Sequence, residues 1–243
     1  MLDWLKQAVG DADIYLFMAV NSLVGRSPAF DYCIQIMDVW HLLLYGWMPV
    51  YLWMLWFDPK VADSRTRIVS GLIGVGVATS LSVVLQRIFS VHPRPFLDPY
   101  GLGVTLIEPP RLAEWYFQNS FPSDTATMCF AVATTIFMVS RKMGIFAFIW
   151  AATAVAFPRV YLAYHWPLDI VGAALLGPAT VLLISRLPIV RFCSLFLVYF
   201  EKFGPQYFYP IAFIYTQQIV ELFQGFQLGL RVSGKIMLAV LRM

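Results

Sequence analysis

The chain alternates between long apolar runs and short polar stretches, and the lengths of the runs predict a membrane protein. Crossing the hydrocarbon core of a bilayer takes about 20 mostly apolar helical residues. Four apolar runs approach or exceed that length, at about residues 32–57, 68–91, 122–140 and 167–185, and a shorter fifth run lies at about residues 144–157. A sixth span is expected near residues 206–226, although Gln217, Gln218 and Glu221 interrupt it. We therefore expect an all-α fold, a polytopic bundle of about six transmembrane helices.

The two ends of the chain have a mixed pattern in which charges interrupt apolar residues. Residues 1–25 predict an amphipathic helix lying in the membrane interface, with a short span as the alternative, and residues 27–31 predict the start of a further helix. Residues 228–243 carry three basic residues on an apolar background and predict a cytoplasmic interfacial helix. No cleavable signal peptide is expected, because acidic residues interrupt the first 25 positions. The resulting division is an N-terminal segment (1–31), a transmembrane core (32–187) and a C-terminal helical extension (188–243).

Composition supports this class and excludes others. Only 13% of the 243 residues are charged and 60% are hydrophobic, whereas soluble domains carry about 25% charged residues. The net charge of +3 is small, and it reflects membrane topology more than a nucleic-acid partner. Cys33, Cys129 and Cys193 all fall in apolar runs without the spacing of metal ligands.

The basic residues predict how the chain is oriented. Cytoplasmic loops carry an excess of Lys and Arg. If the five runs alternate in direction, one side of the membrane collects Lys60, Arg65, Arg67, Arg141, Lys142, Arg186 and Arg191. That side is expected to be cytoplasmic. The polar loop before Ser123 and the loop from Arg159 to His165 then share the outer face of the membrane.

One apolar stretch, residues 157–172, is interrupted by Arg159, His165 and Asp169. Titratable groups in such a context are costly and usually mark function. A helix starting near Trp166 or Pro167 would place His165 and Asp169 one turn apart on the same face. A carboxylate bonded to one ring nitrogen leaves the other free to attack or to take a proton. A buried structural His–Asp pair is the alternative for this stretch taken alone.

Two upstream segments add groups suited to phosphate on the same predicted face. Arg87 and Arg94 lie seven residues apart in the first, and with Arg159 they would supply three permanent positive charges. The second segment, residues 121–127, holds Ser123 and Asp124 at a predicted helix start, where free backbone N–H groups form an anion site. Each signal is weak singly, and together they predict a phosphate pocket.

These three segments resemble the motifs of the type 2 phosphatidic acid phosphatase superfamily, a group of integral-membrane lipid phosphatases with an α-helical core. The family pattern is Lys-x6-Arg-Pro, then Pro-Ser-Gly-His, then Ser-Arg-x5-His-x3-Asp, and the resemblance covers about residues 87–169. It implies that His165 forms a phosphohistidine supported by Asp169. It also implies a phosphate site with no metal and no cofactor, made by Arg87, Arg94, Ser123, Asp124, Thr125 and Arg159.

Three departures from the pattern are present. Arg87 stands where the family has Lys, which keeps the charge, and Pro158 replaces the Ser before Arg159. Asp124 in place of Gly is similar to the Pro-Ser-Asp-His variant of undecaprenyl-diphosphate phosphatases. Thr125, however, stands where the family has a His that protonates the leaving group, and Thr cannot act as that acid near neutral pH. Two readings of His92 stay open: a substitute acid, or a loop residue without a catalytic role.

We expect an enzyme of a bacterial inner membrane whose site faces outward, as the basic residues predict, and whose partners are a phosphorylated lipid and the surrounding membrane lipids. The leading expectation is removal of the terminal phosphate of a polyprenyl diphosphate or related lipid phosphate. Transfer of the phosphoryl group to another acceptor, and binding or transport without cleavage, remain alternatives because of Thr125. That residue is either natural or an engineered change. A homodimer interface, a lateral gate and a partner dock are open roles for residues 188–243.

One polar pair in the first apolar run has no assigned place in this scheme. Asp38 and His41 lie three residues apart, so they would share one face of a helix. We expect them to pair with each other for structural reasons, with a role in the site as the alternative.

Overall fold

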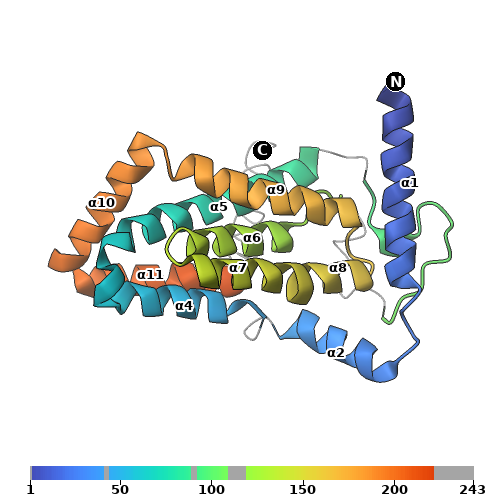
Figure 1. Ribbon diagram of the computed structural model, residues 1–243, viewed down its shortest axis with the longest axis horizontal. Coiled ribbons are helices and arrows are strands. Elements are labelled where there is room, and N and C mark those ends of the chain that lie inside the picture. Colours follow the sequence, from blue (N-terminus) through green and yellow to red (C-terminus); the bar gives the residue numbers. More distant parts are fainter. Residues whose placement is uncertain (1, 41–43, 89–91, 109–118, 222–243) are drawn as a thin grey trace, which may run out of the picture.

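The computed structural model describes residues 2–40, 44–88, 92–108 and 119–221, and every regular element in those ranges is a helix (Figure 1). The α-helices are α1 (Leu2–Asn21), α2 (Pro28–Val39), α4 (Trp47–Phe57), α5 (Arg65–Ile88), α6 (Asp124–Phe137), α7 (Arg141–Trp150), α8 (Phe157–Tyr161), α9 (Pro167–Ile184), α10 (Pro188–Phe203) and α11 (Pro205–Val220). Short 3-10 helices cover Pro59–Ser64 (η1) and Pro95–Leu97 (η2), and a π-helical stretch, Ala151–Ala156 (η4), joins α7 to α8. The all-α prediction is confirmed for the described residues.

Helices α5, α6 and α9 pack against one another and form the centre of the bundle (Figure 1). Small residues allow the close approach. A Cβ on Gly177 of α9 would lie 2.5 Å from the Thr127 carbonyl oxygen of α6, and a Cβ on Gly74 of α5 would lie 2.9 Å from the Cα of Val181. Contacts of this kind are typical of helix packing in membranes. They fix α9 against its neighbours, which matters because the first turn of α9 belongs to the site.

Within the described ranges, three helical segments are long and apolar enough to cross a membrane: Arg65–Ile88, Arg141–Tyr161 and Pro167–Ile184. Helix α6 is apolar but shorter, and most of its residues are buried. Large apolar side chains on the outer surface of α9, such as Leu175 and Leu183, are exposed, as expected where lipid surrounds a protein. The chain is therefore an integral membrane protein, while the count of six spans stays a prediction.

The first apolar run does not form the single span that its length predicted. Helix α2 ends at Val39, with Trp40 as its C-cap, and α4 begins at Trp47 after Gly46. Pro49 gives a physical reason, because it has no N–H to donate to residue 45 and its ring would clash with that carbonyl in a continuous helix. The interruption brings the end of α2 to the end of the bundle where α8 and the start of α9 lie (Figure 1).

Two helices lie across the ends of the bundle instead of along it (Figure 1). Helix α1 crosses the end that holds α8 and the start of α9, and its buried Phe17 packs on Trp166 with ring centres 4.9 Å apart. Helix α10 lies at the opposite end, and α11 runs back along the bundle from there. The predicted interfacial helix at residues 228–243 and the last part of the predicted sixth span lie outside the described residues.

Candidate functional site

The three motif segments meet at the end of the bundle beside α1. The guanidinium of Arg94, just before η2, lies 3.3 Å from the ring of His165, just before α9. The backbone N–H of Ser123, which caps α6, donates to the Asp169 carbonyl oxygen at 3.3 Å. Asp124 is close enough to interact electrostatically with His165, Arg94 and Arg159. Groups from all three segments therefore surround one buried imidazole.

The contacts of His165 define which ring nitrogen carries the proton. Its Nδ1 faces two acceptors, the Ser120 carbonyl oxygen at 3.0 Å and the Asp169 Oδ2 atom at 3.3 Å. Its Nε2 faces an Arg94 Nη1 donor at 3.3 Å. We therefore assign the proton to Nδ1, because a donor there and a lone pair on Nε2 satisfy all three contacts. The Nε2 lone pair points toward the guanidinium that would hold an anion.

Burial keeps this imidazole neutral. The His165 side chain is fully buried, and burial together with the nearby Arg94 charge lowers the pKa of His165 to about 4. Burial also lowers the pKa of Arg94, to about 10, so Arg94 remains a cation at neutral pH. The result is a neutral imidazole beside a fixed positive charge, a combination that is suited to attack on a phosphate anion.

Two backbone N–H groups at the start of α9 bond to carboxylates, one on Asp169 and one on Asp13. Oδ2 of Asp169 accepts a hydrogen bond from the Trp166 backbone N–H at 2.8 Å, and Pro167 opens the helix as predicted. The next N–H, that of Leu168, donates to Oδ1 of Asp13 in α1 at 2.8 Å. Asp13 is 4% exposed. Helix α1 thus caps the helix that carries Asp169, a role that the sequence analysis did not find.

Arg159 has a carboxylate partner that comes from far away in the chain. Its Nη1 donates to Oδ1 of Asp38 at 2.8 Å, and its guanidinium carbon lies 5.1 Å from the centre of the Tyr164 ring. The sequence analysis singled out Asp38 but expected it to pair with His41. His41 lies outside the described residues, and in the structure Asp38 pairs with Arg159. This pair fixes the second buried guanidinium of the site.

The helix start at Ser123 forms as predicted. Ser123 is fully buried and its hydroxyl accepts a hydrogen bond from the Ala126 N–H at 3.4 Å, so it caps α6. Its neighbour Pro122 is held by Gln86 of α5, whose side chain donates to the Pro122 carbonyl oxygen at 2.7 Å. Thr125 is buried, and both its backbone N–H and its hydroxyl donate to Oδ1 of Asp124. The Thr125 hydroxyl is therefore already engaged by the adjacent carboxylate.

Arg87 is the one predicted phosphate ligand that the structure leaves apart. It is exposed in the last turn of α5. No hydrogen bond or ion pair joins it to the cluster within the ranges that the structure describes. Its neighbour Gln86 is buried and faces the Ser123 segment instead. Its place in the phosphate site stays a prediction.

His92 lies on the other side of Asp169 from His165. Its Nδ1 makes a hydrogen bond with the Ser120 hydroxyl at 2.8 Å and lies 3.3 Å from Oδ1 of Asp169, an ion-pair distance. Although burial opposes protonation, the Asp169 carboxylate outweighs it and raises the pKa of His92. Its side chain is 32% exposed. One carboxylate therefore lies between two histidines, a buried neutral one and an accessible one that holds a proton more readily than usual.

No group of three His, Cys, Asp or Glu side chains that could hold a metal ion is found among the described residues. The cluster brings together a buried imidazole, two guanidinium groups and a helix N-terminus. Such an arrangement suits binding and transfer of a phosphoryl group.

Comparison with known proteins gives the class to which this arrangement belongs. The model of the PAP2 superfamily matches residues 68–192, which include every motif residue of the cluster. The chain belongs to this superfamily. The match begins at the fourth residue of α5 and ends at the fifth residue of α10, so α1, α2, α4 and α11 lie outside it.

Several curated proteins are similar over the same region. The bacitracin transport permease protein BcrC of Bacillus licheniformis is 29% identical over 59% of this chain and 66% of its own length. The putative undecaprenyl-diphosphatase YbjG of Escherichia coli is 29% identical over 54% and 61%, and the undecaprenyl-diphosphatase of Sulfolobus acidocaldarius is 28% identical over 55% and 59%. The chain thus spans about two thirds or less of the length of these relatives.

Among solved structures, the crystal structure of Aquifex aeolicus LpxE is similar in fold. The TM-score is 0.52 at 23% sequence identity, over 72% of this chain and 94% of that chain. This likeness supports the helical membrane fold.

Proposed function

We propose that the protein is a membrane lipid phosphatase that removes the terminal phosphate of a polyprenyl diphosphate through a phosphohistidine at His165. The observation that carries this proposal is the buried, neutral imidazole whose Nδ1 faces Asp169 and whose Nε2 faces Arg94. Membership of the PAP2 superfamily and the similarity to undecaprenyl-diphosphatases support the same reaction class.

The reaction proceeds in two steps. The Nε2 lone pair of His165 attacks the terminal phosphorus, the P–N bond forms, and the bond to the bridging oxygen breaks to release the lipid monophosphate. Water then attacks the same phosphorus, the P–N bond breaks, and inorganic phosphate leaves while Nε2 regains its lone pair. Arg94 and Arg159 stabilise the charge on the transferring oxygens, and Asp169 stabilises the ring while Nε2 is bonded to phosphorus.

The substrate class follows from the leaving group. A lipid alkoxide needs an acid, because its parent alcohol has a pKa near that of water, about 15.7. A phosphate monoester leaves far more readily, since its second pKa is about 6. Thr125 cannot supply a proton, and this favours a diphosphate over a monophosphate. His92 is the candidate donor, because its pKa is raised and its side chain is accessible.

The membrane position follows from the charges. Arg141 and Lys142 begin α7 at the end of the bundle opposite to the site, and the positive-inside rule places such clusters in the cytoplasm. The site then opens on the outer face of a bacterial inner membrane, where a lipid diphosphate would present its headgroup.

A second candidate function is binding or transport of a lipid phosphate without cleavage. Thr125 favours it, since the residue that supplies the acid in the family pattern is missing. The name of the Bacillus licheniformis relative, a transport permease protein, is consistent with such a role.

Phosphate release by the purified protein tests the proposal. A polyprenyl diphosphate and a lipid monophosphate are offered side by side to the wild type and to His165→Asn. Arg94→Gln removes a charge inside the site, and Arg141→Gln is its matched control at the far end of the bundle. We expect release from the diphosphate only, lost in the first two variants and kept in the third. Tight lipid binding without release would establish the second candidate instead.

A further inference from the structure

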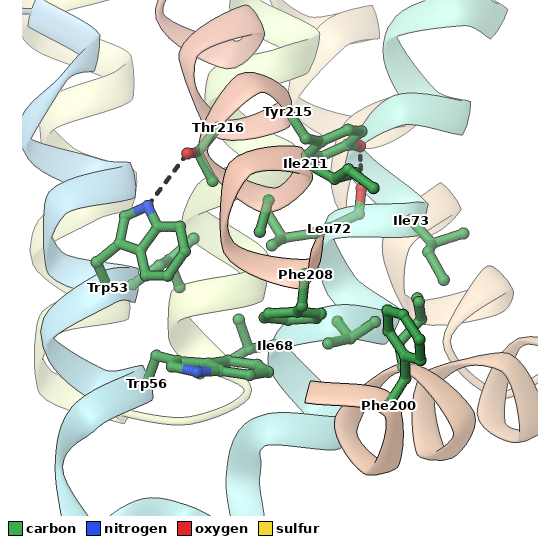
Figure 2. Close-up of a pocket in the computed structure, with 14 residues that line it drawn as sticks. Trp53, Trp56, Ile68, Leu72, Ile73, Phe200, Phe208, Ile211, Tyr215 and Thr216 are labelled. Atoms are coloured by element: carbon green, nitrogen blue, oxygen red, sulfur yellow. Dashed lines mark hydrogen bonds between the residues drawn. The ribbon is translucent and has the colours of Figure 1, made fainter. Parts of the chain in front are cut away.

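An apolar pocket lies far from the phosphate cluster, between α4, α5, α10 and α11 (Figure 2). Its volume is about 220 Å³. A dry apolar cavity of about 150 Å³ is already large enough to bind benzene. The 14 lining residues are almost all apolar, and Trp56, Ile68, Phe200 and Phe208 line one end of it.

Few polar groups lie at the pocket wall, and the side chains of Trp53, Tyr215 and Thr216 are hydrogen-bonded within the protein. The Trp53 indole N–H donates to the Thr216 hydroxyl at 3.1 Å, and that hydroxyl donates to the Phe213 carbonyl oxygen at 3.0 Å. The Tyr215 hydroxyl donates to the Leu72 carbonyl oxygen (Figure 2). The pocket therefore presents hydrocarbon surface to an occupant, and a ligand with polar groups would lose its hydration there without compensation.

The surroundings of the pocket identify the source of the occupant. Ile211 lines the pocket and is 66% exposed, so the pocket reaches the outer surface of a membrane-embedded bundle. Phe213 and Ile214 on the same helix are also exposed. The Arg65–Glu201 ion pair, at 3.2 Å, lies beside Trp56, so charged side chains lie next to one end of the pocket. The apolar material in contact with the exposed side of the pocket, at α11, is the hydrocarbon of the bilayer.

The distance from the phosphate cluster distinguishes this pocket from a substrate site. Its α5 residues, Ile68–Ile73, precede the last turn of that helix by about 15 residues, which is about 22 Å at the helical rise. The cluster lies beyond that last turn. Helices α4 and α11, which build half of the pocket, lie outside the region matched by the superfamily.

We propose that this pocket binds an acyl chain of a membrane phospholipid, in the half of the bilayer opposite to the phosphate cluster. The bound chain fills the space between α11 and α5 and so fastens the C-terminal helices to the core that the superfamily model matches. This site is independent of the proposed reaction.

A photoactivatable phospholipid with a diazirine on its acyl chain tests the proposal. It is added in equimolar amount to the purified protein in detergent, and the labelled residues are mapped by mass spectrometry. The variant Ala212→Trp fills the pocket, and Ala212→Leu is a milder filling if the first fails to fold. Ile214→Trp is the matched control, because Ile214 is exposed on the same helix and does not line the pocket.

We expect labelling within residues 208–216 of the wild type, a loss of about tenfold in Ala212→Trp, equivalent to about 1.4 kcal/mol, and little change in Ile214→Trp. Unlabelled phospholipid should displace the probe. No labelling of these residues, or equal labelling of the filled variant, would overturn the proposal. Displacement by a polyprenyl diphosphate but not by phospholipid would also overturn it, since the pocket would then hold the substrate chain.

Discussion

The buried carboxylate of Asp13 lowers the free energy of unfolding when it is ionised. Replacing Asp13 by Asn therefore gives a quantitative test of how the site is built. It is buried between α1 and α9, where Oδ1 accepts the Leu168 N–H at 2.8 Å. The charged groups that face it are Asp169 and His92. Burial, with a smaller contribution from the Asp169 charge, raises the pKa of Asp13 from 3.8 to about 6.

The sign and size of the effect follow from this pKa. Between pH 4 and 6 the Asp13 carboxyl is ionised in the unfolded chain but still protonated in the folded protein. The free energy of unfolding therefore falls as the pH rises through this range. Above pH 6 the full cost of about 3 kcal/mol is reached, because each pKa unit corresponds to about 1.4 kcal/mol. Asp13→Asn keeps an acceptor for the Leu168 N–H and removes the charge. It should therefore be about 2–3 kcal/mol more stable than the wild type at pH 7.5 and equally stable near pH 4.

Thermal unfolding in detergent at a series of pH values measures this difference. We expect Asp13→Asn to unfold roughly 5–10 °C above the wild type at pH 7.5, with the gap closing toward pH 4. Asp11→Asn is the control, since Asp11 is exposed on the same helix. If His92 is the proton donor, losing the Asp13 charge should also move the alkaline limit of activity to lower pH. A destabilised Asp13→Asn, or a gap that does not vary with pH, would refute the reasoning.

Three further predictions concern the cluster itself. Asp38→Ala should lower the free energy of unfolding by about 3–5 kcal/mol, because it removes the acidic partner of a buried guanidinium. Asp38→Asn keeps an acceptor for Arg159 and should lower the free energy of unfolding by less. Chemical unfolding of the two variants and the wild type measures both differences. Thr125→His should raise hydrolysis of a lipid monophosphate by about 10²–10⁴-fold and change diphosphate hydrolysis little, and equal effects on both would contradict the leaving-group argument. Activity should fall below about pH 4, where His165 takes a proton and loses its lone pair. If His92 donates the proton to the leaving group, activity of the wild type should also fall at alkaline pH, and this fall should be absent in His92→Gln. A pH–rate profile of the wild type and of His92→Gln tests both expectations.

Local pattern predicted the parts of the fold and site that depend on neighbouring residues. Helix α9 begins at Pro167 as expected, and the four-residue spacing places His165 and Asp169 in contact. The serine cap at Ser123 also forms where the sequence indicated. These features depend on one turn of helix and on capping chemistry, which short stretches of sequence encode.

Partners from distant segments were not predictable in the same way. Asp13 and Asp38 lie 155 and 121 residues before their partners, Leu168 and Arg159, and no local spacing relates them. Each was visible only as a carboxylate in an apolar context. Arg87 is a different case, because matching spacing along a chain does not fix the direction of a side chain, and its role in the phosphate site stays a prediction. Adjacent residues point about 100° apart on a helix, so Gln86 faces the core while Arg87 faces outward.

The central claim is that His165 carries the phosphoryl group during turnover, and trapping that intermediate tests it most directly. The protein would be mixed with a polyprenyl diphosphate labelled in its terminal phosphate, quenched in alkali within a single turnover, and the labelled residue mapped. The account predicts label on His165 in the wild type and none in His165→Asn. Phosphate released at an undiminished rate by His165→Asn, with no label at residue 165 in either protein, would contradict it.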